Sequence, residues 1–577
     1  MKRAGLLLLA VLLVHRVVVL LANPDLLHDW DAGELKHLDL ALFGLPAVEG
    51  GIVDALRRWL SAPENIHHGG YVVLSAGYAL LSKILGHSLL LLRAFPLAAS
   101  VAAAACAATF LRRRAGDRAA LLSLVLFLGA PPILLKWSLT ARGGHTEAIL
   151  LLPLLAVLLD VALRDDRPVR WALAAAVAGF GVYFTYLAAP TAAVLGVAGL
   201  LERARRGRGP GLRRAIGAAT VGALIGFSPW LLGWLVLDLP YLDATIHASA
   251  RPDEASEVLG RGLVDLARGT VSGLPHNLWA WTIGTAQAPA YLAEVPDQLD
   301  YTPTVVEWTA RAVVNLAVVL GVAAGLRRRS PLLIGICLLP AAHYLFVMRL
   351  ANQGGWPEVP HRYLVIAFPA VVIAACLGVS ELRSAHARRA GEATLIAVAM
   401  AALTVTVPWM GLPAPGLDIV ALRDNALGRI HADEAGEMAD LLARLDAADP
   451  EHQQASRRGV GLVYSPIADY FLLFRGDRSR PYPAALFSNE DPLSDTPRRR
   501  AATVNGALEA TVLRARSPAE RDALLCSWRP RAEYAQAVAA GLAARNIRIA
   551  CRPIEPGGAG GEIRGTERRL FGPRGFK

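Results

Sequence analysis

Residues 89–135 read LLLLRAFPLAASVAAAACAATFLRRRAGDRAALLSLVLFLGAPPILL. Two apolar runs, 89–111 and 118–135, flank one short basic turn, Arg112–Arg118. Each run is long enough to cross most or all of a hydrocarbon core of about 30 Å as a helix. An arginine-rich turn between two such runs is typical of a loop on the cytoplasmic side. The stretch therefore predicts a helical hairpin in a membrane.

Apolar runs of similar length recur over the first 410 residues. The other nine cover 4–22, 147–163, 170–184, 186–201, 214–237, 305–325, 331–348, 362–380 and 393–410. The 577-residue chain is 54% hydrophobic with a mean hydropathy of +0.39, whereas soluble proteins contain about 45–50% apolar residues. We therefore expect residues 1–410 to form an α-helical polytopic membrane domain of about eleven spans.

The net charge of +11 does not indicate a nucleic-acid partner. The arginines fall in short clusters between apolar runs, such as Arg112–Arg114 and Arg327–Arg329, rather than along one basic face. Such clusters mark cytoplasmic loops.

The run Tyr71–Leu85 is a twelfth candidate span, and counting it reverses the orientation of everything after it. If it does not cross, five charged clusters share the side of Lys2 and Arg3, as the positive-inside bias requires. These clusters are Arg112–Arg118, Arg164–Arg170, Glu202–Arg214, Arg327–Arg329 and Glu381–Arg389. We therefore expect Tyr71–Leu85 to lie in the membrane interface beside the amphipathic piece Ile52–Leu60. Both belong to a long first external loop, 23–88.

The N-terminus begins Met-Lys-Arg before its apolar run, as a signal peptide does. The run is longer than a signal core, and Ala22-Asn23-Pro24 is a poor cleavage site, so we expect an uncleaved first span with a cytoplasmic N-terminus. Arg16, about six residues from the outer end of this span, is expected to snorkel to the interface. Only five of the 59 basic residues are lysines, which is typical of a GC-rich bacterial genome. The expected location is a bacterial inner membrane.

After eleven spans the rest of the chain lies outside the cytoplasm. Residues 411–556 mix strand-like and helix-like runs, which predicts a separate soluble α/β domain. The strand-like runs are Val460–Tyr464, Tyr470–Phe474, Leu508–Leu513 and Ile547–Ala550. Cys526 and Cys551 lie in this domain, and the sequence is compatible with either a disulfide between them or two free thiols. The Gly-rich tail 557–577 is expected to be disordered.

An unusually polar segment, LLHDWDAGELKH at residues 26–37, follows the first span. A solvated loop start explains one or two of its charges. The alternative is that Asp29, Asp31 and Glu34 face a cavity at the membrane surface, where a desolvated Asp can act as a general base.

This segment resembles the acidic motif of the GT-C class of glycosyltransferases, which includes protein O-mannosyltransferases, the aminoarabinose transferases of lipid A and bacterial family-39-type enzymes. Asp31-Ala32-Gly33-Glu34 is similar to the D-x-G-E form of that motif. Three further stretches are similar to family motifs in the same order along the chain. They are His67-His68-Gly69-Gly70-Tyr71, with glycines where the family has prolines, Leu92–Pro96 with the basic turn Arg112–Ala120, and Pro360–Leu364 with Phe368-Pro369.

The resemblance, which covers residues 1–410, also implies substrate-binding residues. Arg142, His145 and Glu147 stand where the family has an R-x-D pattern, although no Asp is present here. Arg142 would pair with phosphate, and Glu147 with a sugar hydroxyl or a divalent metal. The alternative is a polar turn whose histidine caps the next helix. No cofactor is otherwise expected, and the cysteines and histidines show no metal-site spacing.

The stretch His361-Arg362-Tyr363 lies at the external start of a late span. Arg362 is suited to neutralise the phosphate of a leaving lipid carrier, and an interfacial arginine beside a belt tyrosine is its alternative. His68 and Asp29 complete the expected substrate-binding set.

The resemblance implies an inverting membrane glycosyltransferase. It would transfer a sugar from a polyprenyl-phosphate donor to an extracytoplasmic lipid, glycan or protein, with Asp31 as general base and Glu34 orienting the acceptor. Two other functions stay open. One is a transporter or flippase of lipid-linked saccharides, and the other is a noncatalytic membrane assembly protein.

Overall fold

The computed structural model describes a set of helices and three short strands. The described residues are 2–22, 69–85, 89–131, 134–135, 138–141, 144, 147–207, 209–235, 305–353, 365–406, 461–464, 523–527 and 549–550. The chain divides into two compact units. The first contains most of the helices and the second contains the strands, while helix α5 is shared between them. Each unit is described by itself.

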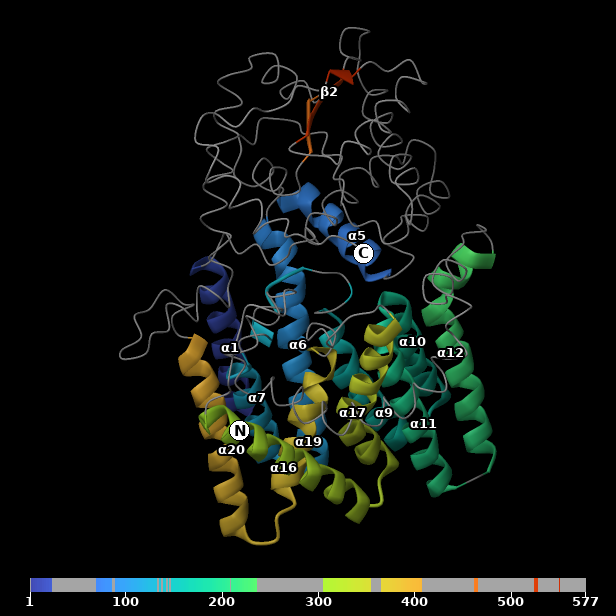
Figure 1. Cartoon of the computed structure of the whole chain (residues 1–577). Coiled ribbons are helices and arrows are strands. Elements are labelled where there is room, and N and C mark those ends of the chain that lie inside the picture. The colour runs from blue at the N-terminus through green and yellow to red at the C-terminus, as the bar shows by residue number, and fades with distance from the viewer. Residues whose placement is uncertain are drawn as a thin grey trace. The chain divides into compact units, whose positions relative to one another are not determined.

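Long helices make up the first unit (Figure 1). They are α1 (Lys2–Ala22), α6 (Leu89–Ala115), α7 (Asp117–Leu128), α9 (Leu151–Asp165), α10 (Pro168–Phe184), α11 (Ala189–Arg206), α12 (Pro210–Leu235), α16 (Val305–Arg327), α17 (Pro331–Gln353), α19 (Phe368–Ser380) and α20 (Ala385–Thr406). Helix α5 covers Gly69–Leu85, and three 3₁₀ turns, η3 (Glu147–Leu150), η4 (Tyr186–Ala188) and η6 (Val365–Ala367), precede α9, α11 and α19.

Four of the described helical segments are long and apolar enough to cross a membrane: Arg3–Ala22, Leu90–Ala115, Tyr186–Arg206 and Pro210–Gly233. Four shorter apolar segments, Pro168–Phe184, Ala312–Arg327, Pro331–Val347 and Val365–Ser380, accompany them. Large apolar side chains such as Leu6, Ile225 and Val319 are more than 60% exposed, as expected for side chains that face lipid rather than water. The chain thus has the helices of a membrane protein, while the expected total of eleven spans remains a prediction.

Helix ends follow proline and glycine rather than the limits of the apolar runs. The run 118–135 was expected to be one span, but α7 ends at Leu128 because Gly129 and the Pro131-Pro132 pair interrupt it. Helix α19 begins at Phe368, six residues later than the run that predicted it, with Pro369 in its first turn. The 3₁₀ turn η6 fills part of the difference.

Small residues let the helix backbones approach closely. Gly222 and Gly226 of α12 lie against Ala172 and Ala176 of α10, where an added Cβ would stand 2.0 Å from either carbonyl oxygen. The α16–α19 pair is built in the same way. Because lipid offers no hydrophobic drive for helix association, such backbone contact is the usual basis of helix pairing in membranes.

The arginine-rich turns gather at one end of the helices, which we call the arginine end. Arg114, at the end of α6, is bonded to Asp160 of α9 and Glu202 of α11. Arg328, after α16, donates to the Arg114 carbonyl oxygen over 2.6 Å and to Glu381 after α19. All five expected cytoplasmic clusters contribute to this end.

Helix α1 also begins at the arginine end. Gly5 lies beside Leu124 and Arg16 is bonded to Phe127, so α1 runs in the same direction as α7. Helix α7 starts directly after the arginine-rich end of α6. The opposite end therefore consists of the C-terminal ends of α1 and α7 and the starts of α9, α11 and α19. Which side of the membrane each end faces remains a prediction.

Three short strands pair in the order β1–β2–β3, all parallel: β1 (Gly461–Tyr464), β2 (Ala523–Ser527) and β3 (Ile549–Ala550). Strands β1 and β3 fall within predicted runs, whereas β2 was not predicted. The other two strand-like runs, the helix-like runs, Cys551 and the tail 557–577 lie outside the described residues. The α/β domain over 411–556 therefore remains a prediction.

Candidate functional site

Nine of the ten predicted site residues lie outside the described part of the chain: Asp29, Asp31, Glu34, His68, Arg142, His145, His361, Arg362 and Tyr363. Glu147 is described. The structure nevertheless describes residues close to several of these positions, and they show which segments come together.

Glu147 opens the 3₁₀ turn η3 and is withdrawn from solvent, with 8% of its surface exposed. The turn packs against η6, which begins at Val365. Arg362 precedes Val365 by three residues. The turn of Glu147 and the turn η6, more than 200 residues apart in the sequence, are therefore neighbours at the opposite end.

The start of α5 lies at the same end. Gly69, the residue after His68, packs so closely against Tyr183 of α10 that an added Cβ would stand 2.4 Å from its ring and 2.7 Å from its carbonyl oxygen. This contact gives a physical reason for glycine at position 69.

Arg16 is fully buried, which corrects the snorkelling interpretation. Its Nη2 donates to the Phe127 carbonyl oxygen at the end of α7 over 3.1 Å, and its Nε and Nη1 have no hydrogen-bond partner among the described residues. The Phe127 ring packs edge-on against Phe368, the first residue of α19, at 5.4 Å between centroids. The guanidinium is thus held between helices and does not extend along α1 to the interface.

Arg16, Phe127 and Phe368 thus form one chain of contacts. The turn η6, which directly precedes Phe368, packs against the η3 turn that contains Glu147. A buried cation within a membrane span is costly, and such residues commonly mark substrate or ion sites. Arg93, four residues into α6 and inside the Leu92–Pro96 motif, is a second fully buried arginine. Both arginines can be read from the sequence, but only the structure shows that they are buried.

A histidine–threonine pair was missed at the sequence level. His343 of α17 is fully buried, and its Nε2 lies 2.8 Å from Thr191 Oγ1 in the first turn of α11. The available signal was a lone histidine in an apolar run, three residues after Pro340. A hydrogen-bonded core histidine gives the same signal, so the sequence could not distinguish the two.

The opposite end therefore holds two buried arginines, Arg16 and Arg93, and one buried carboxylate, Glu147. Among the described residues no group of three or more Cys, His, Asp or Glu side chains could hold a metal ion. Comparison of the chain with models of known protein families and with curated proteins gives no match.

Proposed function

We propose that this protein is a membrane glycosyltransferase that takes a sugar from a polyprenyl-phosphate carrier. The observation that carries the proposal is the packing of η3 against η6, because it joins the Glu147 turn to the segment that follows Arg362. The acidic D-x-G-E segment begins nine residues after α1 leaves the same end of the bundle. A transfer reaction needs both a carboxylate base and cations for the phosphate at one membrane edge.

In the proposed reaction Asp31 removes the proton from an acceptor hydroxyl or amine. The acceptor atom forms a bond to the anomeric carbon from the face opposite the phosphate, and the bond between that carbon and the phosphate oxygen breaks. The electron pair leaves with polyprenyl phosphate, whose growing charge Arg362 and Arg142 neutralise. Glu34 orients the acceptor, and Glu147 accepts a hydrogen bond from the sugar.

The proposal is tested by reconstituting the full chain in proteoliposomes that contain a panel of polyprenyl-phosphate hexoses, pentoses and amino sugars, with a membrane extract as acceptor source. Free polyprenyl phosphate and transferred sugar are both quantified by mass spectrometry. We expect them to appear in equal amounts with one donor of the panel. Movement of an intact lipid-linked saccharide between leaflets would instead identify a flippase. If the panel is neither consumed nor moved, the noncatalytic assembly function is favoured.

A further inference from the structure

A cavity of about 310 Å³ lies at the arginine end. It is bounded by the end of α6, the end of α11 and the turn between α16 and α17. Five arginines line it, Arg114, Arg205, Arg206, Arg328 and Arg329, against one carboxylate, Glu202. The volume is near the lower limit for small-molecule sites, about 300 Å³. The expected position of the Asp31 segment is at the other end of the helices, so the proposed sugar transfer does not use this cavity.

Glu202 is already fully engaged by the protein. Its Oε2 accepts hydrogen bonds from Ser330 Oγ over 2.5 Å and from the Leu332 backbone N–H over 3.1 Å, which caps the start of α17. Its Oε1 is shared between Arg114 and Arg206, each at 3.4 Å. A single carboxylate that already accepts these four hydrogen bonds does not neutralise the five arginines of the lining.

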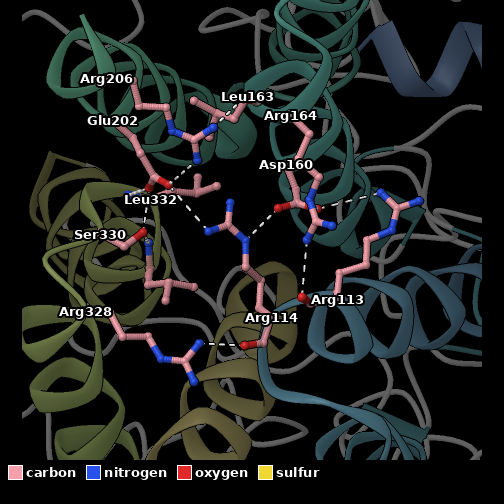
Figure 2. Close-up of polar contacts among 11 residues, drawn as sticks. Arg113, Arg114, Asp160, Leu163, Arg164, Glu202, Arg206, Arg328, Ser330 and Leu332 are labelled. Carbon is pink, nitrogen blue, oxygen red and sulfur yellow. Dashed lines mark hydrogen bonds and ion pairs between the residues drawn. The ribbon is translucent and has the colours of Figure 1, made fainter.

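Carboxylates outside the cavity neutralise two of the five arginines. Figure 2 shows Arg114 between Glu202 and Asp160, and its Nε donates to the fully buried Asp160 over 2.6 Å. Arg328 is paired with Glu381. Arg205 and Arg329 have no carboxylate partner in the part of the chain that the structure describes.

One buried donor of the lining arginines has no acceptor in the described part of the chain, and the Arg329 backbone is unusual. Arg114 Nη2 is buried and has no hydrogen-bond partner among the described residues. The Arg329 backbone has a left-handed φ of 48°, a conformation that non-glycine residues seldom adopt, and its carbonyl oxygen accepts a hydrogen bond from Arg205. Buried donors in native proteins almost always have an acceptor, so Arg114 Nη2 points to a ligand that supplies one.

We propose that this cavity binds a phosphate group. Arginine forks match the several oxygen acceptors of a phosphate, and the ion pairs strengthen as the site loses water. The same chemistry is offered by the headgroup of an anionic phospholipid, which would enter from the adjoining leaflet, and by soluble phosphate. In either case the anion neutralises the excess cations and joins α6, α11 and the α16–α17 turn.

The test uses the full chain with Arg329→Gln, because the Arg329 side chain holds no other part of the described structure. Arg389→Gln is the matched control, an exposed arginine at the same end on α20 and outside the cavity. Arg329→Lys keeps the positive charge but loses the planar guanidinium, which can donate two parallel hydrogen bonds. One arm titrates detergent-solubilised protein with inorganic phosphate at constant ionic strength by calorimetry. The other measures retention of phosphatidylglycerol relative to phosphatidylcholine by native mass spectrometry.

We expect the unmodified protein and Arg389→Gln to bind equally, Arg329→Gln to bind about tenfold more weakly, and Arg329→Lys to lie between them. An effect confined to the first arm identifies soluble phosphate as the ligand, and one confined to the second identifies a lipid headgroup. Thermal unfolding of each variant shows that the fold is retained. The proposal is overturned if neither probe distinguishes the unmodified protein from Arg329→Gln, or if Arg389→Gln loses binding to the same extent.

Discussion

Arg16 and Glu147 are charged side chains withdrawn from solvent at the end of the helices opposite the arginine-rich turns. The sequence allowed Glu147 to be singled out, because it stands beside Arg142 and His145 in a polar segment between two apolar runs. For Arg16 the sequence led to the wrong prediction, namely a side chain at the membrane interface. A cation six residues from the end of a span reaches the interface if the helix faces lipid. Helix α7, which packs against α1 and accepts the hydrogen bond from Arg16, lies more than 100 residues away in the sequence.

Replacement of Arg16 by methionine separates a structural role from a substrate role. Exchange of a buried charge for an apolar side chain of similar length is often neutral or stabilising when the charge serves the fold alone. If Arg16 faces the donor phosphate, Arg16→Met should raise the KM for the lipid donor roughly tenfold, the effect of losing one charge-assisted hydrogen bond. The thermal unfolding midpoint should stay the same or rise.

Donor-dependence kinetics and thermal unfolding of the same preparations provide this check. Arg118→Met, at the exposed start of α7, is the control and should change neither quantity. An unchanged donor KM would contradict a substrate role and assign Arg16 to the fold alone.

At the scale of elements, the apolar runs predicted where helices exist better than where they begin and end. Runs such as 4–22 and 170–184 correspond to α1 and α10 within two residues. The run 118–135 is shorter as a helix because Gly129 and two prolines interrupt it. Hydropathy averaged over a span does not detect such breaks, whereas the local chemistry of glycine and proline does. Helix pairing was not predicted, since small residues are abundant throughout the chain and only the structure shows which of them meet.

The α10–α12 contact makes a specific prediction about glycine. Gly226→Ala should destabilise the protein by about 1–3 kcal/mol, because its added Cβ would overlap the Ala176 backbone. Gly217→Ala is the matched control on the same helix, with nothing within 4 Å of its added Cβ. It should be neutral or more stable by about 0.5–1 kcal/mol. Thermal unfolding in one detergent measures both. Equal effects of the two changes would mean that α10 and α12 do not approach closely at Gly226.

For the whole molecule, the positive-inside bias predicted that five distant clusters share one side of the membrane, and the structure joins them through shared ion pairs at one end. This part of the fold follows from charge placement along the chain. The candidate site follows less completely. The motifs name its residues, but neither the packing of η3 against η6 nor the burial of Arg16 is visible in local sequence, since both depend on contacts between distant segments.

Topology is tested by cysteine labelling. In a background whose five native cysteines are replaced, Lys83→Cys and Arg113→Cys are introduced separately and probed in intact cells with a membrane-impermeant thiol reagent. Lys83→Cys should be labelled because α5 is expected to lie in the external interface, and Arg113→Cys should be protected because the arginine end is expected to face the cytoplasm. The reverse pattern would mean that α5 crosses the membrane and that the proposed site faces inwards.

In the proposed reaction a carboxylate just beyond α1 drives sugar transfer, and Asp31→Asn removes this carboxylate alone. The amide keeps the shape of the side chain but cannot take a proton. Transfer from the polyprenyl-phosphate donor, measured as released polyprenyl phosphate, should fall by ~10²–10⁴-fold while membrane insertion and thermal unfolding are unchanged. Asp29→Asn, two residues away, should keep most of its activity. If Asp29→Asn alone is inactive, the motif lies two residues earlier than proposed, and full transfer by both variants would contradict a catalytic role for this segment.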